Sequence, residues 1–318
     1  MTDDRRGLAL GLHLGVLALL GALQLVLPPF HHGMVARVMV LAAYAVGYNV
    51  LLGYTGLMSL GHAMFFAAGM YGTGLTIQHW GFGAGAGFLA GIVSGLAVAA
   101  AVGLVTLRTA GPAFLIVTMM LAQAFNLATL YFNDVTGGDQ GFILSGLGLD
   151  LFGVRLAFAD PAVKYNAALV VFAACLLLSL WLTGSPAGRV LLALKENEER
   201  TRLLGYNTVR CRLFAVVVSG LLSAVAGSTY TLLFSYVGST FGGILYSIYP
   251  LLWTLLGGAG TTLGPLVGTL VMTYFVDVAS AITTGYLIVV GAALIVMVLW
   301  APAGIVGGIR ARWARWLP

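Results

Sequence analysis

Residues 53–62, with the sequence GYTGLMSLGH, separate two long apolar runs. Three glycines mixed with threonine, serine and histidine interrupt the apolar pattern that a continuous membrane helix would show. A broken helix exposes backbone polar groups, which a membrane tolerates only where protein or water covers them. The stretch therefore predicts a broken or re-entrant segment near residues 53–62.

The composition around this stretch places the chain in a membrane. Hydrophobic residues make up 60% of the 318 residues, charged residues only 8%, and the mean hydropathy is +1.00. A soluble domain carries about 25% charged residues, so a soluble enzyme, a disordered chain and a disulfide-built protein are excluded. Two cysteines are too few for a disulfide framework or a metal site. The chain is predicted to be an all-α, polytopic integral membrane protein.

Ten apolar runs are long enough to cross a bilayer, which takes about 17–25 residues. The first follows two arginines but is too long for a signal peptide, and we expect it to be retained as a helix. The predicted spans are Leu8–Leu27, Val35–Gly53, Ser59–Ile77, Gly87–Leu107, Ala113–Phe132, Tyr165–Thr183, Leu213–Leu233, Ile244–Gly260, Gly264–Thr283 and Tyr286–Ala301.

The basic residues give the spans an orientation. With a cytoplasmic N-terminus and ten alternating spans, Arg37, Arg155 and Lys164 count as outside, and the other twelve of the fifteen lysines and arginines fall inside. Such a bias is a strong positive-inside signal, so both termini are predicted to be cytoplasmic. The net charge of +5 follows from this topology and gives no indication of nucleic-acid binding.

Residues 184–212 form the longest segment predicted on the inside. Ser185 and Pro186 favour a helix start, and Gly205 favours its end. Two pairs with i,i+4 spacing, Glu196 with Arg200 and Glu198 with Arg202, predict ion pairs on one helix. The adjacent Leu203 and Leu204 would be exposed to water. The segment is thus either a solvated connector or a docking surface for a soluble partner.

Residues 133–164 form the longest segment predicted on the outside. Glycines at 137, 138 and 141 permit a tight turn. This turn would contact an external partner, cap a vestibule, or be an ordinary surface turn.

Glycines at four-residue spacing, at 83–95 and at 260–268, predict close helix packing. Polar groups inside the predicted spans are the candidates for a solute pathway, although interhelical hydrogen bonding or packing explains most of them equally well. Asp277, the one acidic residue within a span, should face the bundle interior or a cavity. The pathway candidates are Asn49, Ser59, His62, Gln123, Asn126 and Asp277. No arginine ladder, Walker motif, metal cluster or catalytic triad accompanies them in the sequence.

Several motifs in order resemble the permease subunits of bacterial branched-chain amino acid ABC importers. They are residues 53–66 (GYTGLMSLGHAMFF), 108–118 (RTAGPAFLIVT), 136–138 (TGG), 185–189 (SPAGR), 204–207 (LGYN) and 257–265 (GGAGTTLGP). The extended outer loop is similar to the LivM-type permease rather than the shorter LivH-type one. The resemblance covers roughly residues 40–308.

The resemblance implies an importer built from this permease, a homologous LivH-type permease, two cytoplasmic ATPases and a periplasmic substrate-binding protein. Residues 1–318 would form a single permease domain in the bacterial inner membrane, without an enzymatic activity or a cofactor of its own, since ATP and Mg²⁺ belong to the ATPases. Segment 184–212 would carry the coupling helix, and transport would proceed by alternating access. The implied coupling residues are Lys195, Glu198, Glu199, Arg200, Arg202, Leu203, Leu204 and Gly205.

The substrate stays open at this point. Hydrophobic amino acids are the first expectation. Leu57 stands where many amino acid permeases of the family have glutamine, which resembles the urea-type branch, so urea, short amides and small carboxylates are alternatives. A self-sufficient channel or secondary carrier is a hypothesis of another class. It would depend on Asp277 and His62 for an ion site.

Overall fold

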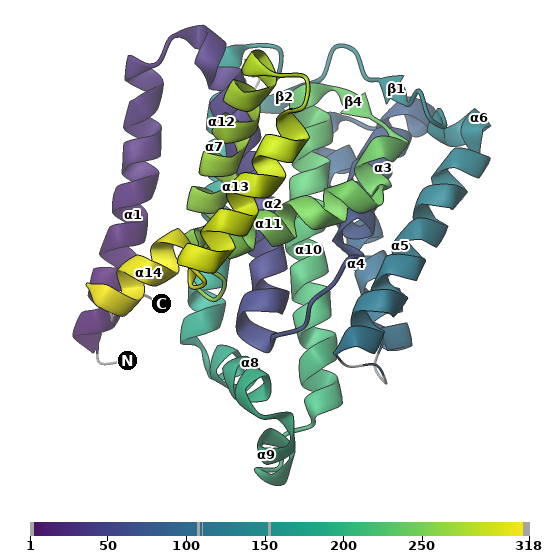
Figure 1. The fold of residues 1–318 in the computed structure, drawn as a ribbon. Coiled ribbons are helices and arrows are strands. Elements are labelled where there is room, and N and C mark those ends of the chain that lie inside the picture. Colours follow the sequence, from purple (N-terminus) through teal and green to yellow (C-terminus); the bar gives the residue numbers. More distant parts are fainter. Residues whose placement is uncertain (1–2, 107–108, 110, 152–153, 314–318) are drawn as a thin grey trace.

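The computed structural model describes residues 3–106, 109, 111–151 and 154–313, which form a bundle of helices (Figure 1). The long helices run between two ends of the bundle, with α8 and α9 at one end and the short strands at the other. The helices are α1 (Asp3–Val26), α2 (Pro29–Thr55), α3 (His62–Trp80), α4 (Ala84–Thr106), α5 (Pro112–Tyr131), α6 (Asn133–Thr136), α7 (Pro161–Gly184), α8 (Pro186–Glu196), α9 (Glu198–Leu203), α10 (Thr208–Phe234), α11 (Ile244–Gly257), α12 (Gly264–Ile282), α13 (Tyr286–Trp300) and α14 (Gly304–Arg312).

Each predicted span coincides with a helix, and Leu107 at the end of one predicted span lies outside the described residues. Seven described helices, α1, α2, α4, α5, α7, α10 and α12, are long and apolar enough to cross a bilayer. This confirms a multi-pass membrane protein. Helices α11 and α13 have 14 and 15 residues, which at 1.5 Å per residue span about 21–23 Å of a hydrocarbon core about 30 Å thick. The total of ten spans therefore stays a prediction.

Helix α2 is the centre of the bundle. Almost every residue between Val35 and Thr55 is buried, because α2 packs against α7, α10, α11 and α12. Helices α3, α4 and α10 pack against one another in a second group. Helix α1 is mostly exposed and stands at the edge of the bundle, where it contacts α7 (Figure 1).

The helices approach closely at glycines, as the four-residue spacing predicts. A Cβ atom added to Gly268 of α12 would lie 1.8 Å from the carbonyl oxygen of Trp253 in α11. A Cβ atom on Gly91 of α4 would lie 2.5 Å from the carbonyl oxygen of Gly69 in α3. Only a residue without a side chain lets these backbones touch, and close contact is the main source of helix association in lipid.

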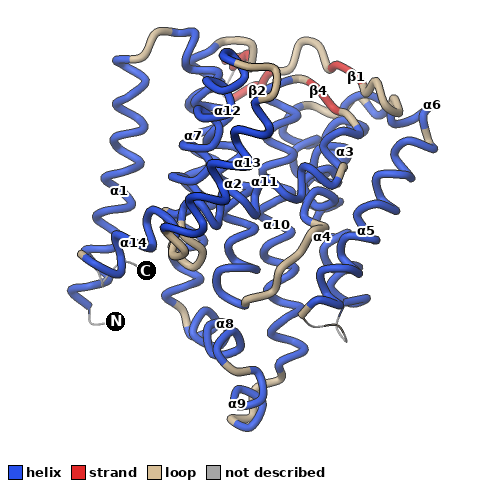
Figure 2. Tube along the Cα trace, viewed as in Figure 1, coloured by secondary structure: helices blue, strands red, loops and turns tan. Residues whose placement is uncertain are grey.

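The predicted break after α2 is present but shorter than residues 53–62. Helix α2 continues to Thr55 and ends at Gly56, whose φ of 71° is left-handed and favours glycine. Residues 56–61 then form an extended connector that runs from the end of α2 back into the bundle, where α3 begins at His62 (Figures 1 and 2). Whether this connector is re-entrant in a bilayer stays a prediction.

The opposite end of the bundle departs from the purely helical expectation. Four short strands lie there in two antiparallel pairs (Figure 2). The strands are β1 (Phe142–Ile143), β2 (Gly148–Leu151), β3 (Val154–Ala157) and β4 (Tyr236–Val237). β1 pairs with β4, so the long outer segment is fastened to the end of α10. The glycine turn is confirmed, with positive φ at Gly137, Gly138 and Gly141.

The contact between α11 and α12 can be tested at Gly268. We expect Gly268→Ala to lower the stability of the detergent-solubilised protein by at least about 1–3 kcal/mol, because the added methyl group forces the two backbones apart. Gly291→Ala in α13 is the control, since nothing lies within 4 Å of its added Cβ. The control should be neutral or slightly stabilising. Equal melting temperatures for both variants would contradict the close packing.

Candidate functional site

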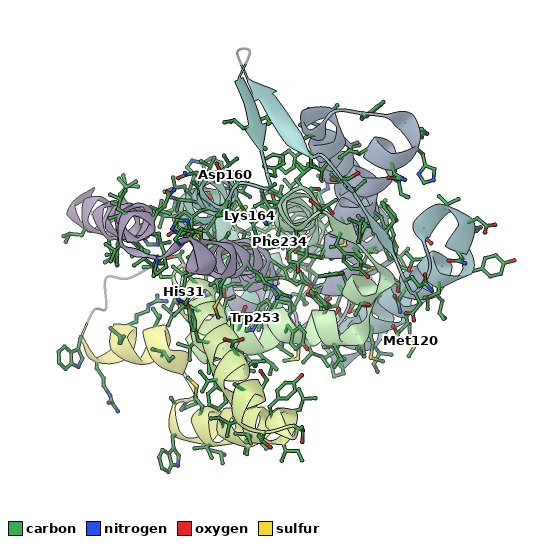
Figure 3. The ribbon with its side chains drawn as sticks, turned by 90° about the horizontal axis from the view of Figure 1, so that it is seen from above. His31, Met120, Asp160, Lys164, Phe234 and Trp253 are labelled. Atoms are coloured by element: carbon green, nitrogen blue, oxygen red, sulfur yellow. The ribbon has the colours of Figure 1, made fainter. Side chains whose placement is uncertain are left out.

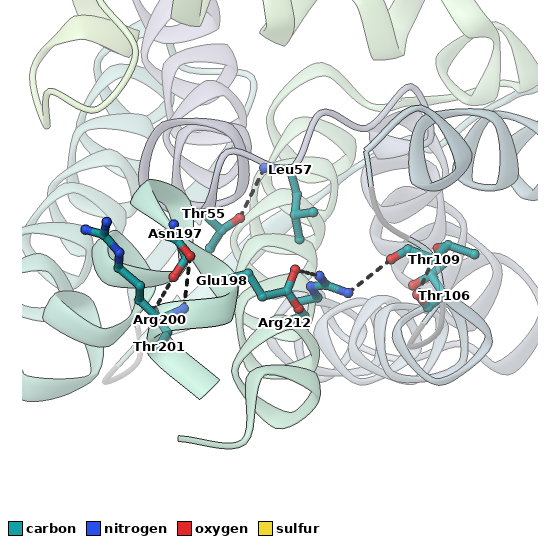
Figure 4. A network of polar contacts seen from close by, with 9 residues as sticks. All are labelled: Thr55, Leu57, Thr106, Thr109, Asn197, Glu198, Arg200, Thr201 and Arg212. Atoms are coloured by element: carbon teal, nitrogen blue, oxygen red, sulfur yellow. Dashed lines mark hydrogen bonds and ion pairs between the residues drawn. The ribbon is translucent and has the colours of Figure 1, made fainter. Parts of the chain in front are cut away.

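Two short helices, α8 and α9, project from one end of the bundle (Figure 1). The backbone N–H of Gly188 donates to the Ser185 hydroxyl at 3.2 Å, which confirms the predicted helix start. Leu191 and Leu194 bury the inner face of α8. The helix ends at Glu196, because Asn197 is extended and caps α9 instead, accepting a hydrogen bond from Arg200 N–H at 2.9 Å (Figure 4).

The break at Asn197 corrects the predicted ion pairs. Neither Glu196 with Arg200 nor Glu198 with Arg202 lies within ion-pairing distance in the described part of the chain. Glu198 pairs instead with Arg212 of α10, whose side chain is largely buried and also donates to the Thr109 carbonyl at 3.4 Å (Figure 4). This ion pair fastens α9 to α10.

The end of α9 is an exposed apolar corner. Leu203 and Leu204 are 81% and 74% exposed, and Gly205 has the left-handed φ of 89° that ends the helix, as predicted. Glu199 and Arg202 form a pair at 3.9 Å on the same surface, with both side chains mostly exposed, so the pair adds little stability. We call Leu203, Leu204 and Gly205 the α9 corner.

Lys195 connects α8 to the centre of the bundle. Its ammonium group donates a hydrogen bond of 2.8 Å to the carbonyl oxygen of Gly53 in the last turn of α2. Its aliphatic stem lies against Gly56, where an added Cβ would be 3.2 Å from Lys195 Cγ. The last four carbonyl groups of a helix lack partners within the helix, so a lysine is well suited to this position.

Asn49, one turn before Gly53 on α2, binds the loop between α11 and α12. Its amide nitrogen donates to the Thr261 carbonyl at 2.9 Å, and its amide oxygen accepts from Gly260 N–H at 2.9 Å. Arg310 of α14 donates to the Gly260 carbonyl at 3.0 Å. His13 of α1 lies 2.6 Å from the Thr262 hydroxyl. Helices α1, α2 and α14 thus all hold the loop of residues 258–263, which we call the 258–263 loop.

His62 and Ser59 lie in the interior beside α2. His62 is fully buried, with Nε2 2.7 Å from the Ser219 hydroxyl of α10, and the Tyr48 ring packs edge-on at 4.6 Å. The Tyr48 hydroxyl donates to the Ser59 carbonyl at 2.9 Å. Among the described residues, His62 Nδ1 has no hydrogen-bond partner. The aromatic rings around His62 favour the packing interpretation of this histidine.

The other pathway candidates lie apart from this group. The Asn126 side chain is half-buried on α5 next to Gly242, and its amide oxygen has no hydrogen-bond partner within the described residues. Gln123 is exposed on α5. Asp277 does not face the interior of this bundle: its side chain is exposed on α12, within the last turns of the helix. That it lines a cavity stays a prediction. The structure therefore places Ser59 and His62 around Tyr48, directs Asn49 to the 258–263 loop, and leaves the remaining candidates separate.

The sequence analysis missed residues that act over long sequence distances. Ser219, Arg310 and His13 contact partners more than 45 positions away, which local spacing does not reveal. Arg37 is a different case, because a charge inside a span was a visible signal. It counts as outside in the topology, yet it lies within α2 (Pro29–Thr55). No group of three or more metal-ligating side chains occurs in the described ranges.

We expect the hydrogen bonds of Asn49 to be essential for the stability of the 258–263 loop. The substitution Asn49→Ala removes the partners of the Thr261 carbonyl and the Gly260 N–H. Each buried group left without a hydrogen bond lowers the free energy of unfolding by about 1–3 kcal/mol. We expect a clear loss of thermal stability in detergent. Asn166→Ala is the control, because Asn166 is exposed and, within the described residues, its side chain donates to the Ala162 carbonyl of its own helix. An equally stable Asn49→Ala protein would show that the loop does not depend on this residue.

Comparison with known proteins gives the family relationship. Residues 32–299 match the family described as "Branched-chain amino acid transport system / permease component". The chain is 26% identical over 288 residues to the high-affinity branched-chain amino acid transport system permease protein LivM of Salmonella typhimurium, covering 84% of this chain and 68% of the relative. It is similar to LivM of Escherichia coli at 26% over 291 residues, with the same coverage. It is 27% identical over 284 residues to Escherichia coli LivH, with 84% and 91% covered. No solved structure matches.

Proposed function

Because this chain belongs to the permease family of branched-chain amino acid transport systems, we propose that it is the transmembrane permease subunit of an ATP-driven ABC importer. It moves branched-chain or other hydrophobic amino acids from the periplasm to the cytoplasm by alternating access. The observation that carries the proposal is the α9 corner, an exposed apolar surface that Lys195 and Glu198 fasten to the two longest helices, α2 and α10.

The α9 corner is the docking surface for a cytoplasmic ATPase. Leu203 and Leu204 protrude at the end of the bundle, and a solvated connector has no need for two adjacent exposed leucines. They follow four charged residues of α9, as is common at the polar rim of protein interfaces: Glu198, Glu199, Arg200 and Arg202. Two ATPases, one for each permease of the importer, bind and hydrolyse ATP with Mg²⁺, and this chain binds no cofactor.

The contacts of α8 and α9 give a route from the ATPase to the transport path. A displacement of α8 acts on the last turn of α2 through Lys195, and α2 acts on the 258–263 loop through Asn49. A displacement of α9 acts on α10 through Glu198 and Arg212. Helix α2 packs against α10 and α11, and α10 packs against α3 and α4. Closure of the ATPases therefore shifts packed helices as groups and opens the transport path first to one side of the membrane and then to the other.

The family relationship supports a proposal for the remaining subunits of the importer. LivM and LivH are the names of two relatives of this chain, and we propose that it acts as the LivM-type subunit beside a LivH-type permease. Residues 1–318 form one permease domain in the bacterial inner membrane. The first residues of α1 lie at the same end of the bundle as α8 and α9 (Figure 1), which supports cytoplasmic termini. A periplasmic binding protein delivers the solute at the end that carries residues 133–164.

The structure gives less support to the two alternative functions, a permease for urea or small amides and a self-sufficient channel or carrier. Leu57, the residue that resembles the urea-type branch, is buried among Leu51, Tyr54 and Leu191, where α2 meets α8. Its identity therefore bears on packing more than on selection of urea or small amides. A self-sufficient channel or carrier would need an ion site, yet Asp277 is exposed and His62 is enclosed by aromatic rings.

The docking surface is tested by the double variant Leu203→Ser/Leu204→Ser. We expect it to reduce co-purification of the ATPase from native membranes by more than about tenfold, because burial of each leucine contributes roughly 1.5–3 kcal/mol. Ile143→Ser is the control, since Ile143 is an equally exposed apolar residue at the opposite end of the bundle. Mass spectrometry of the wild-type complex should recover a second permease and two ATPases. Undiminished ATPase recovery with the double variant would exclude the α9 corner as the docking surface.

The Lys195 contact should separate docking from transport. In Lys195→Met the hydrogen bond to the Gly53 carbonyl is lost while the α9 corner is unchanged. We expect normal ATPase recovery but at least about a fivefold lower uptake of leucine per ATP hydrolysed, since about 1 kcal/mol of coupling corresponds to that factor. Arg189→Met on the exposed face of α8 is the matched control. Equal transport by the two variants would remove Lys195 from the route.

A further inference from the structure

Arg37 is a charged residue in the membrane-spanning part of α2 that neither the docking surface nor the route from it uses. It lies about 12 Å along the helix from Pro29, at a rise of 1.5 Å per residue. At that depth an arginine is expensive unless it faces a polar cavity or a partner. Its side chain is exposed at the surface of this chain, so the charge is accessible rather than sealed into the core.

The groups that face Arg37 are two tyrosine hydroxyls. Its guanidinium interacts with Tyr230 of α10 and Tyr246 of α11. Tyr44, two helical turns further along α2, donates to the Tyr246 carbonyl at 2.9 Å and so fixes the backbone of α11 beside α2. Within the described residues no carboxylate lies at ion-pairing distance from Arg37. The guanidinium donates to the neutral tyrosine hydroxyls, which accept through their oxygen atoms, and the positive charge has no anionic partner among the described residues.

Aromatic rings continue from these tyrosines into the bundle. Phe241 packs between Tyr230 and Tyr246, with ring centroids 5.0 and 4.6 Å away, and Phe66 stacks on Phe241 at 6.0 Å. Tyr249 continues the row beside Tyr246 at 5.6 Å. Phe66 and Phe241 are buried behind this surface, whereas Tyr246 and Tyr249 are half-buried. We call Arg37, Tyr230 and Tyr246 the arginine–tyrosine site, and the partly exposed rings of Tyr246 and Tyr249 its apolar wall.

The chemistry of this arrangement suits one class of ligand. A guanidinium presents donors in a planar fork that matches the two oxygens of a carboxylate, and phenolic hydroxyls add further donors. Aromatic rings provide an apolar surface against which an aliphatic side chain can pack. A small molecule with a carboxylate at one end and an apolar group at the other therefore fits both parts of the surface.

We propose that the arginine–tyrosine site binds the carboxylate of the solute during its passage through the outer half of the permease, while the apolar wall contacts the solute's side chain. The inference rests on the proposed function, because it needs a carboxylate solute to reach this surface. It assigns Arg37 a role that urea or an amide would not need, and so favours amino acids and other small carboxylates as the solute class.

Lys164 provides a matched basic residue for comparison. It lies in the first turns of α7, and its ammonium group is 5.2 Å from the centroid of the Phe234 ring. Figure 3 shows Lys164 and Phe234 next to each other when the bundle is viewed from above. Its charge is thus already partnered by an aromatic face.

The test measures uptake of radiolabelled leucine into proteoliposomes that contain the assembled importer, with saturating binding protein outside. We expect Arg37→Gln to lower the uptake rate at least about tenfold and Arg37→Lys to fall between it and wild type, since lysine keeps the charge but loses the fork. Tyr246→Phe keeps the ring and should lower uptake several-fold. Lys164→Gln should transport like wild type. Purified complexes are compared for subunit content and melting temperature before uptake is measured.

The possible outcomes distinguish failure of the proposed importer function from failure of the arginine–tyrosine site. If wild type does not import leucine, the proposed function fails before Arg37 is tested. If wild type imports leucine and Arg37→Gln does so equally well, the arginine–tyrosine site is overturned and the importer stands. If Arg37→Gln loses the second permease while Tyr246→Phe complexes stay intact and transport normally, Arg37 pairs with the partner subunit and the site is also overturned. If Arg37→Gln cannot be assembled, reduced uptake by intact Tyr246→Phe complexes supports the site.

Discussion

The carbonyl oxygen of Gly53 is the point where the projecting helix α8 is attached to α2, the central helix of the bundle. It lies in the last turn of α2, where carbonyl groups have no partner within the helix, and it accepts the ammonium hydrogen bond of Lys195 at 2.8 Å. One turn earlier Asn49 holds the 258–263 loop through two hydrogen bonds. Without this pair of contacts α8 would be held to the bundle by its buried leucines alone, and the loop would lose its link to α2. The lower half of α2 therefore joins the projecting helices to α11, α12 and α14.

The close packing of the bundle determines how such a contact can act. Helices that touch backbone to backbone at glycines, as α11 and α12 do at Gly268, cannot slide past one another in small steps. We therefore expect packed helices to move as groups. The connector of residues 56–61 joins α2 to α3, because it leaves α2 at Gly56 and enters the bundle before His62.

The local parts of this structure were predictable and the long-range parts were not. Apolar runs located a helix at each of ten positions, Ser185 gave the start of α8, and the glycine-rich stretch gave the break after α2. The sequence analysis missed the break at Asn197 because the residues on both sides of it fit one continuous helix. It therefore also missed Arg212 as the partner of Glu198. The strands β1 and β4 pair across 95 positions, as Phe142 with Val237, which no local spacing encodes. Arg37 counts as outside in the topology although it lies within α2, since such a count assigns a charge near the end of a span to the adjacent loop. Ser59 and His62 lie around Tyr48 because the connector after α2 runs back along that helix, whereas the exposure of Asp277 on α12 depends on tertiary packing that its own sequence neighbours do not reveal.

The most direct test of the account is whether α8 and the 258–263 loop move together when the ATPases close. Pulsed electron paramagnetic resonance can measure this in the assembled importer, with Cys175 and Cys211 replaced and spin labels at the exposed positions Arg189→Cys on α8 and Ile309→Cys on α14. A second pair, Arg189→Cys with Met120→Cys on α5, reports on movement between groups of helices. The account predicts that a non-hydrolysable ATP analogue leaves the first distance unchanged and shifts the second by a few ångströms. A change between α8 and α14 as large as that between α8 and α5 would contradict it.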